Sequence, residues 1–497
     1  MEPQAATSFI DQIHSLINLL NGPLWTWLVP LLLGTGLFFT LRSGFVQVRL
    51  FGESIRAMSG SRTQGDDEHG HGITSFQAFV TGLASRVGTG NIAGVAIAIA
   101  TGGPGAVFWM WITALLGMSS AFAESSLAQL FKVRDHGNRQ FRGGPAYYIT
   151  QGMGQKWMGV LFAISLIFCF GFAFNAIQAN TIIEAVKSST GCVDAEDACQ
   201  QGWMVYKHVG GAILIILTAP IIFGGIRRVA RFAEAIVPAM ALLYLLMACY
   251  VVLTNLGAVP AVFGLIFGNA FTLDAAGGGL LGGMVSQAMM LGIKRGLFSN
   301  EAGMGSAPNA AAAADVKHPV SQGLIQMLGV FVDTLIVCSC TAFIILLSGM
   351  PIEGSSLTGA QLTQAALESQ VGSFGQYFLV VVLFLFAFSS IIGNYAYAES
   401  NMQFIHGSPR TMVLFRMVVL GFVYFGAINS VPVVWDLGDL TMGVMAVINL
   451  IAILILSPMV FLLLKDYLRQ QQAGETPQFK LADYPELQAK VHSDLWN

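Results

Sequence analysis

Charged residues are scarce in this chain. Asp, Glu, Lys and Arg make up 10% of its 497 residues, whereas hydrophobic residues make up 55%. A soluble globular protein has about 25% charged residues, so the composition excludes an ordinary soluble domain and indicates an all-α polytopic membrane protein. The lipid bilayer is its expected partner, and a net charge of −3 gives no reason to expect a nucleic-acid partner.

Signatures of catalysis and secretion are missing as well. The chain has no HExxH, no GxSxG and no set of His and Asp clustered in apolar segments, so we expect no enzyme activity. The start, MEPQAATSFIDQ, has no basic segment before an apolar core, and we expect no cleaved signal peptide. Of only six cysteines, Cys192 and Cys199 lie in a polar loop, STGCVDAEDACQQG. We predict a disulfide between them if that loop faces an oxidising compartment.

What the chain does contain is a series of long apolar segments. A helix needs about 20 mainly apolar residues to cross a bilayer. By that length the sequence predicts about eleven transmembrane helices: 24–45, 76–101, 105–131, 157–186, 210–226, 230–254, 277–313, 322–348, 374–397, 411–428 and 440–464. We expect 259–273 to be interfacial or re-entrant, 357–370 to be an amphipathic helix in a loop, and 465–497 to be a soluble, partly disordered tail.

Lys and Arg are distributed unevenly over the connections. With the N-terminus outside, 19 of the 24 lie on the inner side, and only Lys187 and Lys207 lie outside. The other three, Arg86, Lys294 and Arg295, lie within two interrupted segments. Because cytoplasmic loops carry the excess of positive charge, we predict a multi-pass protein of a bacterial-type inner membrane, with the N-terminus outside and the C-terminus cytoplasmic.

Two of the predicted spans contain glycine and charge where an ordinary span would be apolar. The second holds LASRVGTGNIAG (83–94), and the seventh holds QAMMLGIKRGLFSNEAGMGSAP (287–308). Unwound backbone at membrane depth is tolerated only where it is buried in protein or lines a cavity. A pair of glycine-interrupted segments in corresponding halves of a chain indicates the binding site of a secondary transporter.

Close packing between helices is the alternative explanation for these glycines. Packing glycines, however, rarely share a turn with Arg, Lys, Asn and Glu, so we favour two broken helices. Each would open one unit of an inverted repeat of five plus five spans, 76–254 and 277–464, joined by an external connection at 255–276. Residues 1–75 would supply a tail, one extra helix and a cytoplasmic loop, and residues 465–497 a cytoplasmic tail.

Four segments, in order, resemble the signature sequences of the alanine or glycine:cation symporters, also called the sodium:alanine symporter family. They are LASRVGTGNIAGVA (83–96), GGPGAVFWMWITALLG (102–117), RGGPAYYI (142–149) and GIKRGLFSNEAGMGSAP (292–308). The resemblance extends from about residue 24 to about residue 465. It implies the bacterial leucine-transporter-like architecture of the amino acid–polyamine–organocation superfamily. It also implies a Na⁺-coupled amino-acid symporter that works by alternating access.

The first break suits the carboxylate of an amino-acid substrate. Gly88 lets the backbone open, and the N–H groups of Thr89, Gly90 and Asn91 then point into the gap. Free N–H groups at the start of a half-helix bind anions, because the helix dipole is positive there. We therefore predict that these four residues bind the substrate.

The end of the preceding half-helix suits sodium. It frees the carbonyl groups of Ala84 and Val87, which are hard oxygen ligands. The superfamily resemblance implies that hydroxyl groups of the third-from-last span complete the site, here Ser389 and Ser390 in AFSSIIGNY. Serines in a helix can alternatively bond back to the preceding turn.

The resemblance also points to residues that line the substrate pocket. Gln178 in FNAIQAN matches a pocket glutamine of the family, with Asn175 and Asn180 within one turn; an interhelical hydrogen bond is the alternative. Many members have Trp where this chain has Asn394. The resemblance implies an alanine- or glycine-type substrate. The smaller, polar side chain of Asn394 leaves more room and a hydrogen-bonding group, which favours instead a larger polar amino acid such as glutamine.

One carboxyl group in an apolar segment stands out. Asp333 lies in the middle of VFVDTLIVCSC, and an ionisable residue at that depth is a functional candidate. Proton or cation coupling is one role for Asp333, and pairing with Lys294 or Arg295 is the other.

The charge inside the first break needs a partner too. We predict that Arg86 points away from the substrate and pairs with Glu301 or Glu124. Such a pair would hold or gate the broken helix.

An uncoupled or H⁺-coupled facilitator or channel is the alternative function. A channel would need a continuous polar line along its spans, and no span shows a regular polar stripe. We therefore expect a symporter for a small amino acid with Na⁺ as the coupling ion, and no obligate protein partner.

Overall fold

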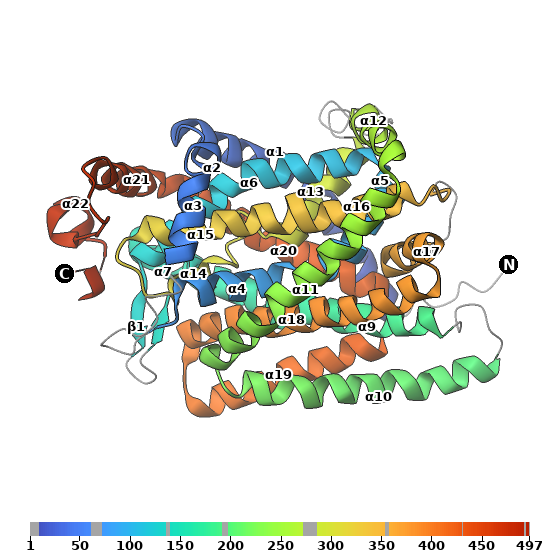
Figure 1. Ribbon diagram of the computed structural model, residues 1–497. Coiled ribbons are helices and arrows are strands. Elements are labelled where there is room, and N and C mark those ends of the chain that lie inside the picture. Colours follow the sequence, from blue (N-terminus) through green and yellow to red (C-terminus); the bar gives the residue numbers. More distant parts are fainter. Residues whose placement is uncertain are drawn as a thin grey trace.

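Long helices that lie side by side make up most of the computed structural model (Figure 1). It describes residues 9–60, 72–135, 140–190, 197–271, 286–352, 357–429, 431–491 and 494–496. In this part of the chain, nine helices are long and apolar enough to cross a membrane. They comprise α1 Phe9–Arg42, α6 Gly105–Leu130, α8 Lys156–Leu166 continued by α9 Phe174–Ser189, α10 Asp197–Ile222, α11 Ile226–Thr254, α15 Pro319–Val330 continued by α16 Ser339–Leu347, α18 Ser373–His406, α19 Pro409–Ile428 and α20 Val431–Ile455.

A tenth span is formed by a bent pair. Helix α4 (Ser75–Arg86) and helix α5 (Val95–Gly102), the latter preceded by a π-helical turn at Gly90–Gly94, meet at an angle of 49°. The eleventh predicted segment, 277–313, is represented by α13 (Gln287–Asn300) and α14 (Pro308–Ala312), and residues 277–285 lie outside the described part. The bundle confirms an all-α membrane architecture, while the count of eleven stays a prediction.

Shorter elements cover the two ends of the bundle. The helices are α2 Val46–Arg49, α3 Phe51–Gly60, α7 Pro145–Gly152, α12 Val259–Asn269, α17 Gly359–Val371, α21 Ser457–Gln472 and α22 Pro485–Gln488, with single 3₁₀ turns at Leu256–Ala258, Leu481–Asp483 and Asp494–Trp496. Strands β1 (Val133–Asp135) and β2 (Gln140–Arg142) pair antiparallel, with Val133 opposite Arg142. Helix α17 confirms the helix predicted at 357–370. It lies with α12 at one end of the bundle, while α21 and α22 lie at the other (Figure 1).

One glycine of the seventh predicted span serves close packing. Helix α13 lies against α6, and a Cβ atom on Gly292 would overlap the backbone oxygen of Ala106. A Cβ on Gly296 would lie 3.4 Å from the Cα of Met110, also on α6, which is an ordinary van der Waals distance. For Gly292 the packing explanation is correct. The unwound part of this segment begins further along the chain.

The C-terminal tail is folded, contrary to the prediction of a partly disordered segment. Phe479, Leu481, Leu487 and Trp496 are buried, and the Trp496 side chain is only 3% exposed. Its indole N–H donates a hydrogen bond of 3.1 Å to the backbone oxygen of Leu130, where α6 ends. A charged tail can fold here because these few apolar side chains are spaced widely and become buried only against the bundle.

A buried lysine completes the contact between the tail and the bundle. Lys132 Nζ lies 4.8 Å from the centre of the Trp496 ring and 4.5 Å from that of Phe141. It also donates a hydrogen bond of 3.0 Å to the backbone oxygen of Ala314. Burial lowers the pKa of Lys132 to about 7. The tail therefore joins the end of α6 to the segment that follows α14.

We expect Trp496→Ala to release the tail while the helix bundle stays folded. The substitution removes the indole hydrogen bond and the cation–π contact, so proteolysis by trypsin at Lys480 should become about tenfold faster, as local opening costs less free energy. Gel analysis of a digestion time course measures this rate. Trp157→Ala is the control, since Trp157 is exposed on the bundle surface, and it should leave the rate unchanged. Equal rates for the two variants would contradict the docking.

Candidate functional site

The first break lies at the predicted RVGTGN segment. Helix α4 ends at Arg86, and the π-helical turn begins at Gly90. A Cβ atom on Gly88 would overlap Ser390 Oγ and lie 3.0 Å from Gln178 Oε1. Glycine at this position therefore lets α18 and α9 bring their side chains directly against the open backbone.

Side chains from other helices bind the backbone groups that the break sets free. The N–H of Thr89 donates to Gln178 Oε1 (3.0 Å), and the N–H of Gly88 donates to Asn91 Oδ1 (2.8 Å). Thr341 Oγ1 donates to the carbonyl of Asn91 (2.6 Å). Gln178 thus reaches the break, as predicted for a pocket residue. The hydroxyl of Thr89 is buried and has no hydrogen-bond partner in the described part of the chain.

Oxygen atoms gather where α4 ends. Ser390 Oγ lies 3.0 Å from the carbonyl oxygen of Ala84, 3.3 Å from that of Val87 and 3.1 Å from that of Phe386. Three of the four predicted sodium ligands are therefore together. Carbonyl and hydroxyl oxygens are the ligands that a hard cation prefers.

Ser389 does not join this group. Its hydroxyl donates to the carbonyl of Phe386 (2.9 Å) and lies 3.5 Å from the sulfur of Met240. Successive residues on a helix point about 100° apart, so Ser389 faces α11 while Ser390 faces α4. For Ser389 the alternative of a bond back to the preceding turn is correct.

The second break follows α13. Glu301, Gly303 and Gly305 all have positive φ angles, 59°, 83° and 84°. The fully buried carboxylate of Glu124 on α6 accepts hydrogen bonds from the N–H groups of Gly303 (3.2 Å) and Gly305 (3.1 Å). The side-chain amide of Asn449 on α20 donates a hydrogen bond of 2.7 Å to the same carboxylate and one of 2.9 Å to the carbonyl of Gly303. One acid and one amide therefore replace the hydrogen bonds that an intact helix would make.

The two breaks are joined through Ser85. Its hydroxyl lies 2.6 Å from Glu301 Oε1 and 2.7 Å from Asn394 Oδ1. The other carboxylate oxygen of Glu301 accepts a hydrogen bond of 2.6 Å from the hydroxyl of Ser306. Asn394 also donates to Asn175 Oδ1 (3.1 Å). The predicted substrate residue Asn394 is therefore bonded to protein on both sides in this conformation.

Arg86 has a different partner from those predicted. The two predicted partners, Glu124 and Glu301, form hydrogen bonds at the second break. No ion pair to Arg86 occurs among the described residues. Its Nη1 donates instead to the backbone oxygen of Gln326 (3.2 Å) and lies 3.4 Å from the side-chain oxygen of that residue. Arg86 therefore makes no direct ion pair with Glu301 or Glu124, contrary to the prediction, and its guanidinium contacts Gln326 on α15.

Asp333 lies at the first break and not beside the two basic residues of α13. Its carboxylate accepts hydrogen bonds from Asn91 Nδ2 (2.7 Å), Ser299 Oγ (2.8 Å) and Thr334 Oγ1 (2.8 Å). It therefore connects the π-helical turn after the first break to the end of α13.

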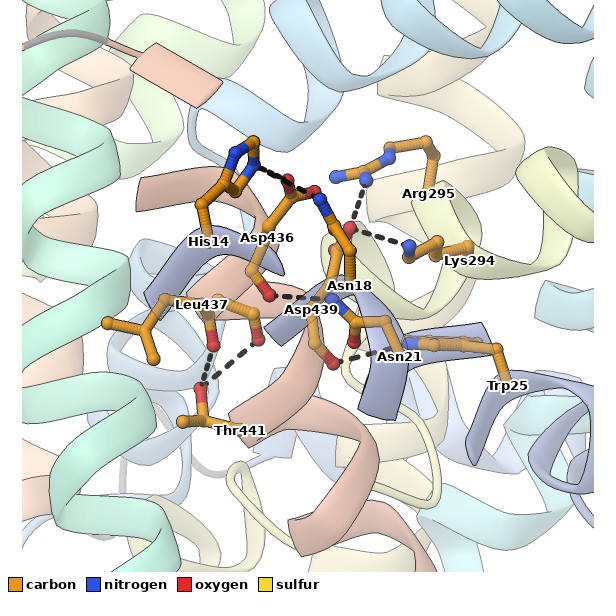
Figure 2. Close-up of polar contacts among 11 residues, drawn as sticks. His14, Asn18, Asn21, Trp25, Lys294, Arg295, Asp436, Leu437, Asp439 and Thr441 are labelled. Carbon is orange, nitrogen blue, oxygen red and sulfur yellow. Dashed lines mark hydrogen bonds and ion pairs between the residues drawn. The ribbon is translucent and has the colours of Figure 1, made fainter. Parts of the chain in front are cut away.

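Asp439 on α20 is the partner of these basic residues. Its Oδ2 lies 2.7 Å from Lys294 Nζ and 2.6 Å from Arg295 Nη2 (Figure 2). The predicted pairing of Asp333 with Lys294 or Arg295 is thus wrong. Asp439 also lies among apolar residues in the sequence, and this position could have identified it as a candidate.

Other sequence predictions meet the structure only in part. Asn180 donates to the carbonyls of Gly426 and Asn429, so it joins helices and does not face the break. The predicted disulfide lies outside the described residues, because Cys192 and the side chain of Cys199 are not described. A further signal in the structure is π-helical geometry, which frees backbone groups and is frequent at functional sites. It occurs next to the first break and again at Phe331–Cys338, around Asp333.

Glu124→Gln should weaken the fold. A carboxamide has only one acceptor atom, so it cannot accept from Gly303, Gly305 and Asn449 together, and we expect a loss of about 2 kcal/mol in the free energy of unfolding. Thermal unfolding of the purified protein measures this as a lower midpoint. Glu234→Gln is the matched control, because Glu234 accepts its hydrogen bond from Gln77 on an exposed surface. If both variants unfold at the same temperature, Glu124 does not hold the break.

These features define a class of protein. Two unwound helices lie side by side in a membrane bundle and are linked by buried polar groups, which is the architecture of a secondary transporter. The transporter MhsT, solved in complex with L-phenylalanine, has this fold: the TM-score is 0.54 at 13% identity, over 78% of this chain and 97% of that one.

Sequence comparisons identify the family. The profile of the sodium:alanine symporter family matches residues 10–481, and the chain belongs to this family. Amino-acid carrier protein AlsT of Bacillus subtilis is 48% identical over 97% of both chains. Probable sodium/glutamine symporter GlnT of the same organism is 47% identical over 94% of this chain and 93% of its own. The protein is a Na⁺-coupled amino-acid symporter in a membrane, and not an enzyme.

Proposed function

We propose that Na⁺ binds between the end of α4 and α18, at the carbonyl oxygens of Ala84 and Val87 and the hydroxyl of Ser390. The observation that carries this proposal is the hydroxyl of Ser390, 3.0 Å and 3.3 Å from those carbonyls. All three atoms are oxygens that a hard cation prefers.

The amino acid binds at the open backbone beside this site. Its carboxylate accepts hydrogen bonds from the N–H groups near Thr89 and Gly90. It thereby displaces Gln178 Oε1, which accepts from the N–H of Thr89 in the structure. The unpartnered hydroxyl of Thr89 supplies a further donor. Gln178, freed from the backbone, turns its amide to the substrate.

The substrate is either of the alanine or glycine type or a larger polar amino acid such as glutamine. A wall of amide and carboxyl groups around Ser85, formed by Asn175, Asn394 and Glu301, supports a polar side chain. The relative GlnT, at 47% identity, is a probable sodium/glutamine symporter, which also supports glutamine.

Coupling follows from the shared backbone. Sodium fixes the carbonyls of Ala84 and Val87, and this fixes the opening that presents the N–H groups three residues later. Each ligand then favours the same conformation, so each raises the affinity for the other. Movement of α4 and α13 about the two breaks gives alternating access.

The arrangement of the chain in the membrane completes the proposal. Residues 76–254 and 277–464 form an inverted repeat, each beginning with a broken helix, and the N-terminus lies outside a bacterial inner membrane with the C-terminus cytoplasmic. The opposite placement of α12 and α17 relative to α21 and α22 supports this arrangement (Figure 1).

Ser390→Ala should raise the Na⁺ concentration for half-maximal uptake about tenfold, since it removes one of the ion's ligands at a cost of about 1.4 kcal/mol. Uptake of radiolabelled alanine and glutamine by proteoliposomes, with external Na⁺ varied, measures this. Ser389→Ala is the matched control, one residue away but turned toward Met240, and it should leave the Na⁺ dependence unchanged. An unchanged Na⁺ dependence in Ser390→Ala would show that the site assignment is wrong.

A proton-coupled or uncoupled facilitator is the second candidate, and the buried carboxylate of Asp333 at the first break is the observation that favours proton coupling. We expect uptake above equilibrium with an inward Na⁺ gradient and none with a pH gradient alone. Asp333→Asn should reduce Na⁺-driven uptake severalfold, because an amide cannot accept from Asn91, Ser299 and Thr334 together. Accumulation driven by pH in the wild type, abolished by Asp333→Asn, would establish the alternative.

A further inference from the structure

A chain of hydrogen bonds between buried side chains runs from α9 to the second break. The side-chain amide of Asn175 donates to the backbone carbonyl of Gly171 (3.2 Å), and the amide of Asn394 on α18 donates to Asn175 Oδ1 (3.1 Å). The hydroxyl oxygen of Ser85 then lies 2.7 Å from Asn394 Oδ1 and 2.6 Å from Glu301 Oε1. None of the four residues that contribute side chains is more than 5% exposed, so these groups must satisfy one another.

The carbonyl of Gly171 fixes the direction of the chain. A carbonyl oxygen can only accept, so Asn175 must turn its NH₂ group to Gly171 and its Oδ1 to Asn394. Asn394 must in turn present its NH₂ group to Asn175 and its Oδ1 to Ser85. Rotation of either amide by half a turn would bring two acceptor oxygens together. Asn394 Oδ1 is therefore an acceptor toward Ser85.

Ser85 has too few protons for its two neighbours. Asn394 Oδ1 needs the single hydroxyl proton of Ser85, because an amide oxygen has no proton of its own. The contact of 2.6 Å between Ser85 Oγ and Glu301 Oε1 has the length of a full O–H···O hydrogen bond. The proton in this contact must then come from Glu301, which donates to Ser85 as a carboxylic acid. Its other oxygen, Oε2, accepts from Ser306 (2.6 Å), as the carbonyl oxygen of an acid can.

The surroundings of Glu301 also favour the neutral acid. The residue is 1% exposed, and burial of an unpaired carboxylate is strongly unfavourable. Arg86 is a basic group within electrostatic range, but its guanidinium donates to Gln326 and forms no ion pair with Glu301 in the described part of the chain. The other titratable groups around Glu301 are acids, a phenol and a thiol: Asp333, Glu124 on α6, Tyr397 on α18, and Cys169 in the π-helical turn Ile167–Ala173.

Loss of this proton would change the whole chain. An ionised Glu301 takes the proton of Ser85 for its own hydrogen bond, since a charged acceptor binds it more strongly than an amide oxygen does. Asn394 Oδ1 then has no donor on that side, and the amide cannot turn over without facing Asn175 Oδ1. The bond between Asn394 and Asn175 is the one that breaks, and the amide of Asn394 becomes free to bind a ligand.

We propose that Glu301 is a proton-binding site, and that its proton holds the amide of Asn394 within this chain of hydrogen bonds. Release of the proton lets the amide turn to the substrate. Glu301 is thus a positioning residue that acts through Ser85 and Asn394. The role of Asn394 at the substrate rests on the function proposed above, whereas the presence of the proton does not. The proton need not be transported, so the proposal is compatible with coupling to Na⁺ alone.

Specificity then depends on pH. A free amide of Asn394 can form a hydrogen bond with the side-chain amide of glutamine, whereas alanine has no side-chain group that could use it. The preference for glutamine over alanine should therefore rise as the pH is raised and Glu301 ionises. One hydrogen bond gained corresponds to a rise of about threefold or more.

Infrared difference spectroscopy of the purified full-length protein detects the proton directly. A carboxylic acid has a C=O stretching band that an ionised carboxylate lacks. At neutral pH this band should be present in the wild type and lost in Glu301→Gln, whose amide donates to Ser85 and accepts from Ser306 in the pattern of the protonated acid. Glu234→Gln is the matched control, because Glu234 lies on an exposed surface, and it should keep the band.

Ser85→Ala keeps the carboxyl group of Glu301 but removes its acceptor. This variant should shift the band to a different frequency, and it provides the same test if Glu301→Gln does not fold. A band that neither variant changes overturns the protonated Glu301.

Competition binding measures the effect on specificity. Radiolabelled L-alanine is bound to the purified protein in saturating sodium and displaced by unlabelled L-glutamine or L-alanine, at neutral and at alkaline pH. The ratio of the two affinities should shift toward glutamine at alkaline pH in the wild type and in Glu234→Gln, and it should be equal at both pH values in Glu301→Gln. A ratio that is constant in the wild type, or that shifts equally in Glu301→Gln, overturns the positioning of Asn394 by the proton.

The outcomes separate this proposal from the sodium site. The infrared band requires neither sodium nor substrate, so it would remain in the wild type even if Ser390→Ala left the Na⁺ dependence of uptake unchanged. Absence of the band would leave the assignment of Ser390 as it stands.

Discussion

Backbone groups released inside a membrane bundle must find hydrogen-bond partners, and the structure is organised around this requirement. Water is absent at that depth, so each unwound N–H or carbonyl needs a side chain. Gln178 and Asn91 accept from the first break, and Glu124 accepts from two N–H groups of the second. The polar residues that are unusual in these apolar helices are there because their side chains bind the unwound backbone.

This requirement also ties distant helices together. The partners of the two breaks come from α6, α9, α16, α18 and α20, so neither break can change shape without moving its neighbours. Ser85 and Glu301 link the breaks directly at 2.6 Å. Interfaces of this kind have discrete arrangements. A change at the end of α4 therefore reaches α13 through hydrogen bonds, which is what the proposed coupling needs.

The parts of this site that are local in sequence were predictable, and the parts that depend on distant partners were not. Glycine, Thr and Asn within one turn indicate an opening at 88–91. The prediction that placed Ser389 and Ser390 in one sodium site overlooked the helical period, which sets successive side chains about 100° apart. Which acid meets which base is decided by helix packing. Glu124 and Glu301 form their hydrogen bonds at the second break, so Arg86 donates to Gln326 instead. Asp439 is the partner of Arg295, although the two residues are 144 positions apart in the sequence. The prediction of a partly disordered tail failed for the same reason. The apolar residues of the tail are too few to indicate a fold without the surface that they cover.

A transporter must also release what it binds, and the first break supplies partners within the protein for the groups that the proposed ligands use. The N–H of Thr89 donates to Gln178, and the hydroxyl of Ser390 lies 3.0 Å and 3.3 Å from the carbonyl oxygens of Ala84 and Val87. At the sites proposed above, each ligand exchanges one set of hydrogen bonds for another and gains little net free energy from any single contact. Binding that replaces internal partners is weak enough to reverse, and the internal partners return when the ligand leaves.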